Sequence, residues 1–252
     1  LKLTELGYRP GAVLATMLPL LAEHIMLEYA CFKIGVVHAP LDLRLKAPEV
    51  VRSLGLIEAR GFAFFGKTGA GDFGDVGRTV REQCPYVKDF IQFTPPAETI
   101  EAALPFETFA ADARRLSDAA TGDATNSVWK AYVAAHEAVR PTDGAQVIYT
   151  TGSTGFPKPA LQSHRNITAQ NMCLAKGFRL DEFSRMLVNL PPSHVGCQGE
   201  QLMTTFFSGG TAVILHVFDA EKSLQAVQQQ KVESFGQIPA MFNMQWRLPN
   251  YS

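Results

Sequence analysis

Short apolar runs alternate with longer amphipathic segments along most of this 252-residue chain. A short apolar run bounded by Gly, Pro or polar residues is typical of a buried strand, and a longer amphipathic segment is typical of a helix. The runs predict strands at Val13–Leu18, Val36–Leu41, Phe62–Phe65, Val87–Phe93, Ala145–Tyr149, Met186–Leu190, Thr211–Leu215 and Val232–Phe235.

Helices are predicted between these strands. They cover Leu20–Ile34, Pro48–Leu54, Val76–Gln83, Ser163–Lys176 and Gln198–Phe207. Gly35 is expected to end the first of these helices. Two more follow: a helix from an Asp219 N-cap to Gln230 and a last helix that begins at Pro239. Strands separated by helices pair in parallel through right-handed crossovers. We therefore expect an α/β fold, with helices packed on mostly parallel sheets.

The middle of the chain differs in composition. Residues 95–143 are rich in Ala, Thr, Asp and Glu, and they predict two surface helices, Glu107–Ala120 and Ser127–Ala138, joined by a Thr121-Gly-Asp turn. We therefore expect three parts: a first α/β unit at 1–94, a peripheral excursion at 95–143, and a second α/β unit at 144–252.

Composition and charge narrow the class of protein. The net charge is −1, so no overall field favours nucleic acid or an anionic membrane. No apolar run reaches the roughly 20 residues that span a bilayer, and no secretory signal opens the chain, so we expect a cytoplasmic location. The four cysteines lack metal-site spacing. The chain opens at Leu1 rather than at Met, and we expect it to be a piece of a longer protein.

The stretch Tyr149-Thr-Thr-Gly-Ser-Thr-Gly-Phe-Pro-Lys158 directly follows an apolar run. Glycines let the backbone turn so that N–H groups point into a concavity, and hydroxyls donate to phosphate oxygens. A lysine just beyond the loop adds a mobile positive charge. This combination predicts a site for a polyphosphate.

A second stretch, Gly61-Phe-Ala-Phe-Phe-Gly-Lys-Thr68, matches the G-x-x-x-x-G-K-[ST] pattern letter for letter. Its centre consists of bulky residues that the apolar pattern assigns to a strand. The residues after it, Gly69-Ala-Gly-Asp-Phe-Gly74, would break the helix that such a loop must open. We therefore reject this match as a nucleotide site.

The stretch at 149–158, with Ser163-His-Arg-Asn166 after it, closely resembles the signature loop of the adenylate-forming enzymes, which include acyl-CoA synthetases, firefly-type luciferases and peptide adenylation domains. The segments Ala30–Val37, Pro40–Leu45, Pro192–Gly196 and Phe235–Pro239 are similar to further motifs of the family in order and spacing. One departure is Pro159, where the family usually has glycine; it predicts a stiffer loop.

The resemblance covers nearly the whole chain but not a whole enzyme. The chain has no Tyr-Gly-x-Thr-Glu segment, whose Glu helps hold magnesium in the family. Its closest match to the family's Thr-Gly-Asp motif, Thr121–Asp123, stands before the phosphate loop and is interpreted as a turn. From the resemblance, we expect the small C-terminal domain with its catalytic lysine to be absent from these 252 residues. The resemblance therefore implies an N-terminal portion of an AMP-binding domain.

The resemblance also implies the chemistry. ATP would activate a carboxylic acid as an acyl-adenylate, and CoA would then take the acyl group. The phosphate-binding residues would be Thr150, Thr151, Gly152, Ser153, Thr154, Gly155 and Lys158. Lys158 would act in catalysis, and Thr150 would be a candidate Mg²⁺ contact. His194 would also act in catalysis, and with Val195 and Gly196 it would line the acyl pocket, where Gly196 and Gly199 leave room for a ligand.

Several alternatives stay open. His194 could instead be a structural histidine satisfied at a helix N-terminus, whereas His164 is expected to cap or pack its helix, and the other histidines are interpreted as structural. The full protein could be an aryl-acid or amino-acid adenylating enzyme that loads a carrier thiol. It could also be a non-catalytic nucleotide-binding module, or a kinase-type NTPase that uses Lys67.

Overall fold

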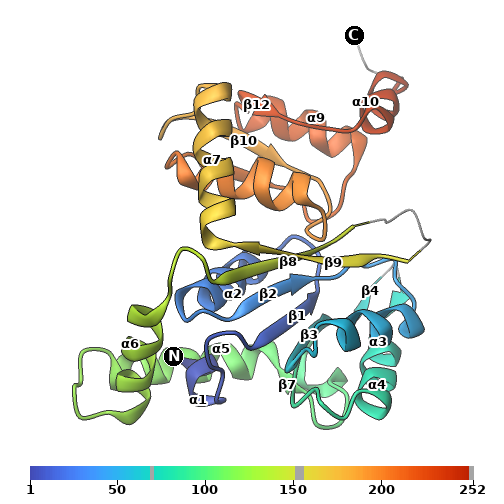
Figure 1. Cartoon of the computed structure of the whole chain (residues 1–252). Coiled ribbons are helices and arrows are strands. Elements are labelled where there is room, and N and C mark those ends of the chain that lie inside the picture. The colour runs from blue at the N-terminus through green and yellow to red at the C-terminus, as the bar shows by residue number, and fades with distance from the viewer. Residues whose placement is uncertain (69–70, 151–155, 250–252) are drawn as a thin grey trace. The chain divides into compact units, whose positions relative to one another are not determined.

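The computed structural model describes residues 1–68, 71–150 and 156–249. Two compact units are present: the first contains residues 1–18 and 23–164, and the second contains residues 19–22 and 165–252 (Figure 1). Each unit combines a sheet with helices, and the main strands within each sheet pair mostly in parallel. The predicted α/β class is confirmed.

The first unit is built on a seven-stranded sheet with the order β7-β6-β3-β1-β2-β8-β9. Its strands are β1 (Val13–Met17), β2 (Val37–Pro40), β3 (Gly61–Phe65), β6 (Asp89–Phe93), β7 (Leu104–Pro105), β8 (Gly144–Thr150) and β9 (Lys158–Ser163). All neighbours pair in parallel except β8 and β9, which are antiparallel. The central strands are buried, which explains their continuous apolar runs.

The helices of the first unit are α1 (Lys2–Glu5), α2 (Ala22–Lys33), α3 (Ala47–Leu56), α4 (Gly74–Gln83), α5 (Phe106–Ala120) and α6 (Ser127–Ala138), with a 3₁₀ turn η1 (Pro96–Glu98). A small antiparallel hairpin joins β4 (Lys67–Thr68) to β5 (Gly71–Asp72). Gly35, predicted to end the helix of α2, has φ +69°, a conformation that favours glycine. The predicted ends of α2 to α6 agree with the structure to within a few residues, whereas α1 and η1 were not predicted.

The segment 95–143 contributes to the first unit. Its strand β7 pairs with β6 and extends the sheet. The two predicted helices are present as α5 and α6, and Asn126 caps α6 by accepting a hydrogen bond from the N–H of Val128 at 2.9 Å. Leu116 of α5 is buried, so part of this segment packs inside the first unit.

The pairing of β8 and β9 places residues 144–163 in the first unit, whereas the sequence led us to expect the second unit to begin at 144. β8 pairs in parallel with β2, more than 100 positions earlier in the chain. The antiparallel partner β9 was not predicted at all, because its polar residues and Pro159 disguise an edge strand.

The second unit has a three-stranded parallel sheet of order β11-β10-β12. Its elements are α7 (His164–Phe178), β10 (Arg185–Val188), η2 (Gly196–Met203), α8 (Thr204–Phe207), β11 (Thr211–Ile214), α9 (Ala220–Gln229), β12 (Ser234–Phe235) and α10 (Pro239–Trp246). The predicted N-cap is confirmed: the Asp219 carboxylate accepts from the N–H of Lys222 at 2.8 Å. The predicted helix 198–207 differs, because η2 is a π-helix that becomes α-helical only at Thr204. Over the described residues, no helix is long and apolar enough to cross a membrane.

Candidate functional site

The β8–β9 hairpin carries the predicted phosphate loop between its strands. Its antiparallel register ends where Thr150 faces Lys158, and both side chains are exposed. The Thr150 hydroxyl donates to the Lys158 carbonyl at 3.4 Å. The predicted contacts Thr151, Gly152, Ser153, Thr154 and Gly155 lie outside the described residues. Their phosphate-binding role therefore stays a prediction, as does the Mg²⁺ contact at Thr150.

Helix α3 contacts the chain on both sides of this loop. Before the loop, the Tyr149 hydroxyl donates to the Ser53 carbonyl at 2.7 Å. Burial raises the pKa of Tyr149, so its hydroxyl keeps its proton and remains a donor. After the loop, the Arg52 guanidinium lies 4.3 Å from the centre of the Phe156 ring. One helix thus holds both described flanks of the loop.

Lys158 belongs to the edge strand β9, and Pro159 follows it opposite Tyr149. An edge strand tolerates proline because the missing N–H would face away from the sheet. The substitution of Pro for the usual glycine is therefore compatible with the hairpin. The register holds the backbone of Lys158 opposite Thr150, and its side chain is exposed.

The rejected Gly61–Thr68 match is a strand followed by a small hairpin. Both neighbours of β3 pair with it along its length, so its N–H groups belong to the sheet rather than to a phosphate. The two glycines have packing reasons. A Cβ on Gly61 would lie 1.8 Å from the Tyr8 hydroxyl oxygen, and a Cβ on Gly66 would lie 2.5 Å from the side chain of Thr94.

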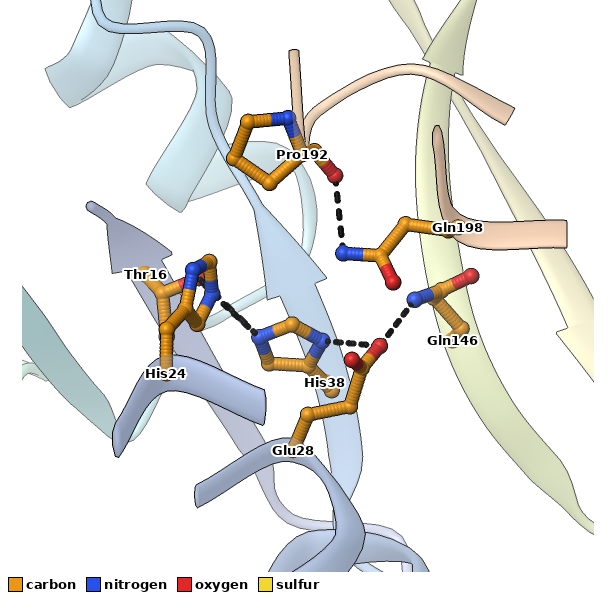
Figure 2. Close-up of polar contacts among 7 residues, drawn as sticks. All are labelled: Thr16, His24, Glu28, His38, Gln146, Pro192 and Gln198. Carbon is orange, nitrogen blue, oxygen red and sulfur yellow. Dashed lines mark hydrogen bonds and ion pairs between the residues drawn. The ribbon is translucent and has the colours of Figure 1, made fainter. Parts of the chain in front are cut away.

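His194 lies in the second unit, in the turn before η2, and its side chain is exposed. Its Nδ1 accepts a hydrogen bond from the N–H of Gly196 at 3.0 Å. This is the contact expected of a histidine satisfied at a helix N-terminus. The buried Gln198 also holds this turn, since its Nε2 donates to the Pro192 carbonyl at 2.9 Å (Figure 2). The acyl-pocket role of His194, Val195 and Gly196 stays a prediction.

One argument for that pocket is wrong. We expected Gly196 and Gly199 to leave room for a ligand, but side chains of the second unit already occupy that space. A Cβ on Gly196 would meet Leu190 at 2.9 Å, and one on Gly199 would meet the Gln170 amide at 3.2 Å. These glycines allow close packing around a buried π-helix.

Comparison with known proteins identifies the family. The profile of the AMP-binding enzyme family matches residues 2–251, almost the entire chain. The chain belongs to the AMP-binding enzyme family. The N-terminal resemblance predicted from the loop at 149–158 is confirmed.

Relatives of this AMP-binding chain include CoA ligases. It is 28% identical over 238 residues to a feruloyl-CoA synthase of Amycolatopsis sp, covering 94% of this chain and 40% of the relative. It is 27% identical over 253 residues to the long-chain-fatty-acid–CoA ligase FadD13 of Mycobacterium tuberculosis, covering 99% and 44%. The chain therefore spans less than half the length of these relatives.

Solved structures show the same fold. The N-terminal domain of FACL13 from Mycobacterium tuberculosis, crystallised with an inhibitor, has a TM-score of 0.78 at 23% identity and covers 99% of this chain and 55% of its own. ATP-bound MatB from Rhodopseudomonas palustris has a TM-score of 0.70 at 19% identity, covering 98% and 43%. At these identities the likeness concerns the fold.

Sequence reasoning missed a buried polar cluster in the first unit of this AMP-binding chain. We define the His–Glu cluster as Thr16, His24, Glu28, His38 and Gln146, which hydrogen-bond to one another (Figure 2). The two histidines had no visible partner in the sequence and were interpreted as structural. The only available signal was the presence of polar residues inside segments predicted to be buried, such as His38 in Val36–Leu41.

His164, expected to cap or pack, begins α7 and places its ring edge-on to Phe32, with centroids 5.8 Å apart. Burial lowers the pKa of His164, and the carboxylate of Asp143 partly opposes this effect. Both observations fit a packing role.

Proposed function

We propose that the protein is the N-terminal part of an ATP-dependent acid–CoA ligase. The observation that carries this proposal is the hydroxyl- and glycine-rich motif between the paired residues Thr150 and Lys158, within a chain that matches the AMP-binding family. The names of its relatives support a CoA ligase, and they include both an aromatic and a fatty acid as substrates of those proteins. The proposed substrate class is accordingly a carboxylic acid.

In the proposed reaction a carboxylate oxygen attacks the α-phosphorus of ATP, and the bond to the bridging oxygen breaks as pyrophosphate leaves. The resulting acyl-adenylate then reacts with the CoA thiol at the acyl carbon, and AMP leaves. Lys158 offsets the negative charge that develops on pyrophosphate, while hydroxyls and N–H groups of the loop hold the phosphates. Mg²⁺, when bound, supplies further positive charge, and Thr150 is the candidate contact from this chain.

Two lysines test the proposal against its NTPase alternative. Lys158 and Lys67 are both exposed and both lie in short edge elements, so they form a matched pair. We expect Lys158→Ala in the full-length protein to reduce acid-dependent ATP–pyrophosphate exchange at least about tenfold, the scale of one lost electrostatic contact in a transition state. We expect Lys67→Ala to leave it unchanged. Loss of ATP binding in Lys67→Ala alone would contradict the assignment.

The same assay separates the ligase from a non-catalytic binding module. A panel of fatty, aromatic and amino acids should include at least one acid that stimulates exchange by the full-length protein. Residues 1–252 alone should show none, because the family's magnesium, ribose and C-terminal lysine groups are not in this segment. Exchange by this segment would overturn that expectation. Binding of ATP without exchange for any acid would favour the module.

A further inference from the structure

The β8–β9 hairpin joins the parallel strands of the first unit where β8 pairs with β2. The register between β2 and β8 contains one Cα pair, His38 with Gln146. By contrast, β1 and β2 share four pairs, and β8 and β9 share six. The regular backbone register between β2 and β8 is therefore short, although the two strands lie side by side. Side chains at the junction add to their attachment.

The same two residues meet at a buried carboxylate. Glu28 on α2 accepts a hydrogen bond from Gln146 Nε2 at 2.6 Å and from His38 Nδ1 at 3.1 Å, both at Oε1 (Figure 2). All three side chains are at most 1% exposed. Hydrogen bonds to a carboxylate strengthen away from water, and removal of the acceptor would leave two buried donors without a partner. Through these two hydrogen bonds, Glu28 on α2 links Gln146 of β8 to His38 of β2.

His38 extends the attachment to β1. Its Nε2 lies 3.0 Å from the Thr16 hydroxyl oxygen, which in turn lies 2.9 Å from His24 Nε2. Because Nδ1 of His38 donates to Glu28, the proton on that nitrogen is fixed, and the orientation of the ring is fixed with it. The hairpin is therefore tied through side chains to α2, β1 and β2 together.

We propose that Glu28, His38 and Gln146 form a positioning cluster, which sets the hairpin in place so that Thr150 and Lys158 meet the polyphosphate of ATP. This inference rests on the proposed function. Gln146 precedes Thr150 by four residues, about 13 Å along a strand, so the cluster acts through the hairpin and not by touching phosphate. Its members are positioning residues rather than catalytic ones.

The chain offers a matched control at Gln92 on β6. Gln92 is a buried glutamine on the same sheet, 2% exposed, and its Oε1 accepts from the N–H of Ile100 at 2.8 Å. Gln146→Leu and Gln92→Leu each remove one buried amide of equal size from one strand. Only the first removes a bond that attaches the hairpin. Glu28→Leu tests the acceptor, and Glu28→Gln keeps an oxygen that can accept from both donors.

Two measurements on the full-length protein test the proposal. In acid-dependent ATP–pyrophosphate exchange, Gln146→Leu and Glu28→Leu should raise KM for ATP about three- to tenfold, the scale of one lost hydrogen bond, with a smaller change in kcat. Glu28→Gln should recover part of this loss. In hydrogen exchange measurements, Gln146→Leu and Glu28→Leu should speed the exchange of backbone amides in 146–150 and 158–162 but not in β1 or β3. Gln92→Leu should change neither KM for ATP nor hydrogen exchange in the hairpin, although it should lower Tm by a similar amount.

The outcomes distinguish the inference from the function on which it rests. A wild-type protein with no exchange for any acid would overturn the proposed function, while hydrogen exchange would still test the hairpin attachment. An active wild type whose Gln146→Leu variant matches Gln92→Leu in KM would overturn the positioning cluster. Faster hydrogen exchange spread evenly over the whole sheet would overturn it too, because that result indicates general destabilisation.

Discussion

The Gly61→Ala variant tests whether packing explains the first glycine of the G-x-x-x-x-G-K-[ST] match. A Cβ at this position would lie 1.8 Å from the Tyr8 hydroxyl oxygen, 3.0 Å from Leu14 Cδ1 and 3.1 Å from Tyr8 Cζ. Tyr8 is 1% exposed, so its ring cannot simply move into water. The ring must shift by about 1.5 Å within a close-packed interior to restore normal contact.

Overpacking of this kind typically costs about 1–3 kcal/mol, and we expect about 3 kcal/mol because the obstructing ring is fully buried. For a protein of this size that loss corresponds to a fall in Tm of about 6–12 °C. Thermal unfolding followed by circular dichroism measures the fall, and urea unfolding gives the free energy. Gly177→Ala is a suitable control, since a Cβ added at this position inside α7 would have nothing within 4 Å.

A double-mutant cycle locates the obstacle. The Tyr8 hydroxyl interacts with the Asp89 carboxylate, so Tyr8→Phe alone should cost about 1 kcal/mol. With the hydroxyl gone, Gly61→Ala should cost only about 1 kcal/mol, because the remaining contacts need to give by a few tenths of an ångström. An equal loss in both backgrounds would refute this reasoning, since Tyr8 would then not be the obstacle.

Two further predictions concern single contacts of the first unit. Tyr149→Phe removes the 2.7 Å hydrogen bond to the Ser53 carbonyl. It should lower the free energy of unfolding, measured in urea, by about 1 kcal/mol. A change within experimental error would show that the bond does not contribute to stability. Burial lowers the pKa of His164 below 6.5, so the unfolded chain binds this proton more readily and stability should rise as pH increases toward 6.5. His164→Gln should flatten that rise in Tm measured across pH, and an unchanged slope would argue against it.

The sequence by itself determined the features that depend on neighbours along the chain. Periodicity placed most strands and helices, because a buried strand or an amphipathic helix needs its apolar residues at fixed local spacing. The N-cap at Asp219 and the helix stop at Gly35 were predicted for the same reason, since a cap satisfies N–H groups within three residues. The motif at 149–158 was long enough to indicate the AMP-binding family, although its loop lies outside the described residues.

Tertiary structure decided which of these elements meet. Gln146 and Glu28 are 118 positions apart, and Tyr149 and Ser53 are 96 apart, so no local pattern could pair them. The assignment of β8 and β9 to the first sheet followed from such long-range contacts. Neither the π-helical conformation of η2 nor the side chains beside Gly196 and Gly199 could be predicted from the sequence.

The same limit applies to the glycines of the rejected match at 61–68. Local reasoning recognised that Phe62, Phe64 and Phe65 suit a strand, but it could not say why Gly61 and Gly66 are glycine. The answer is the proximity of Tyr8 and Thr94, which only the folded chain reveals. The spacing of residues along the sequence specifies which of them share a face of one helix or strand. Packing between elements distant in sequence decides which side chains lie against that face, and therefore how large its own residues can be.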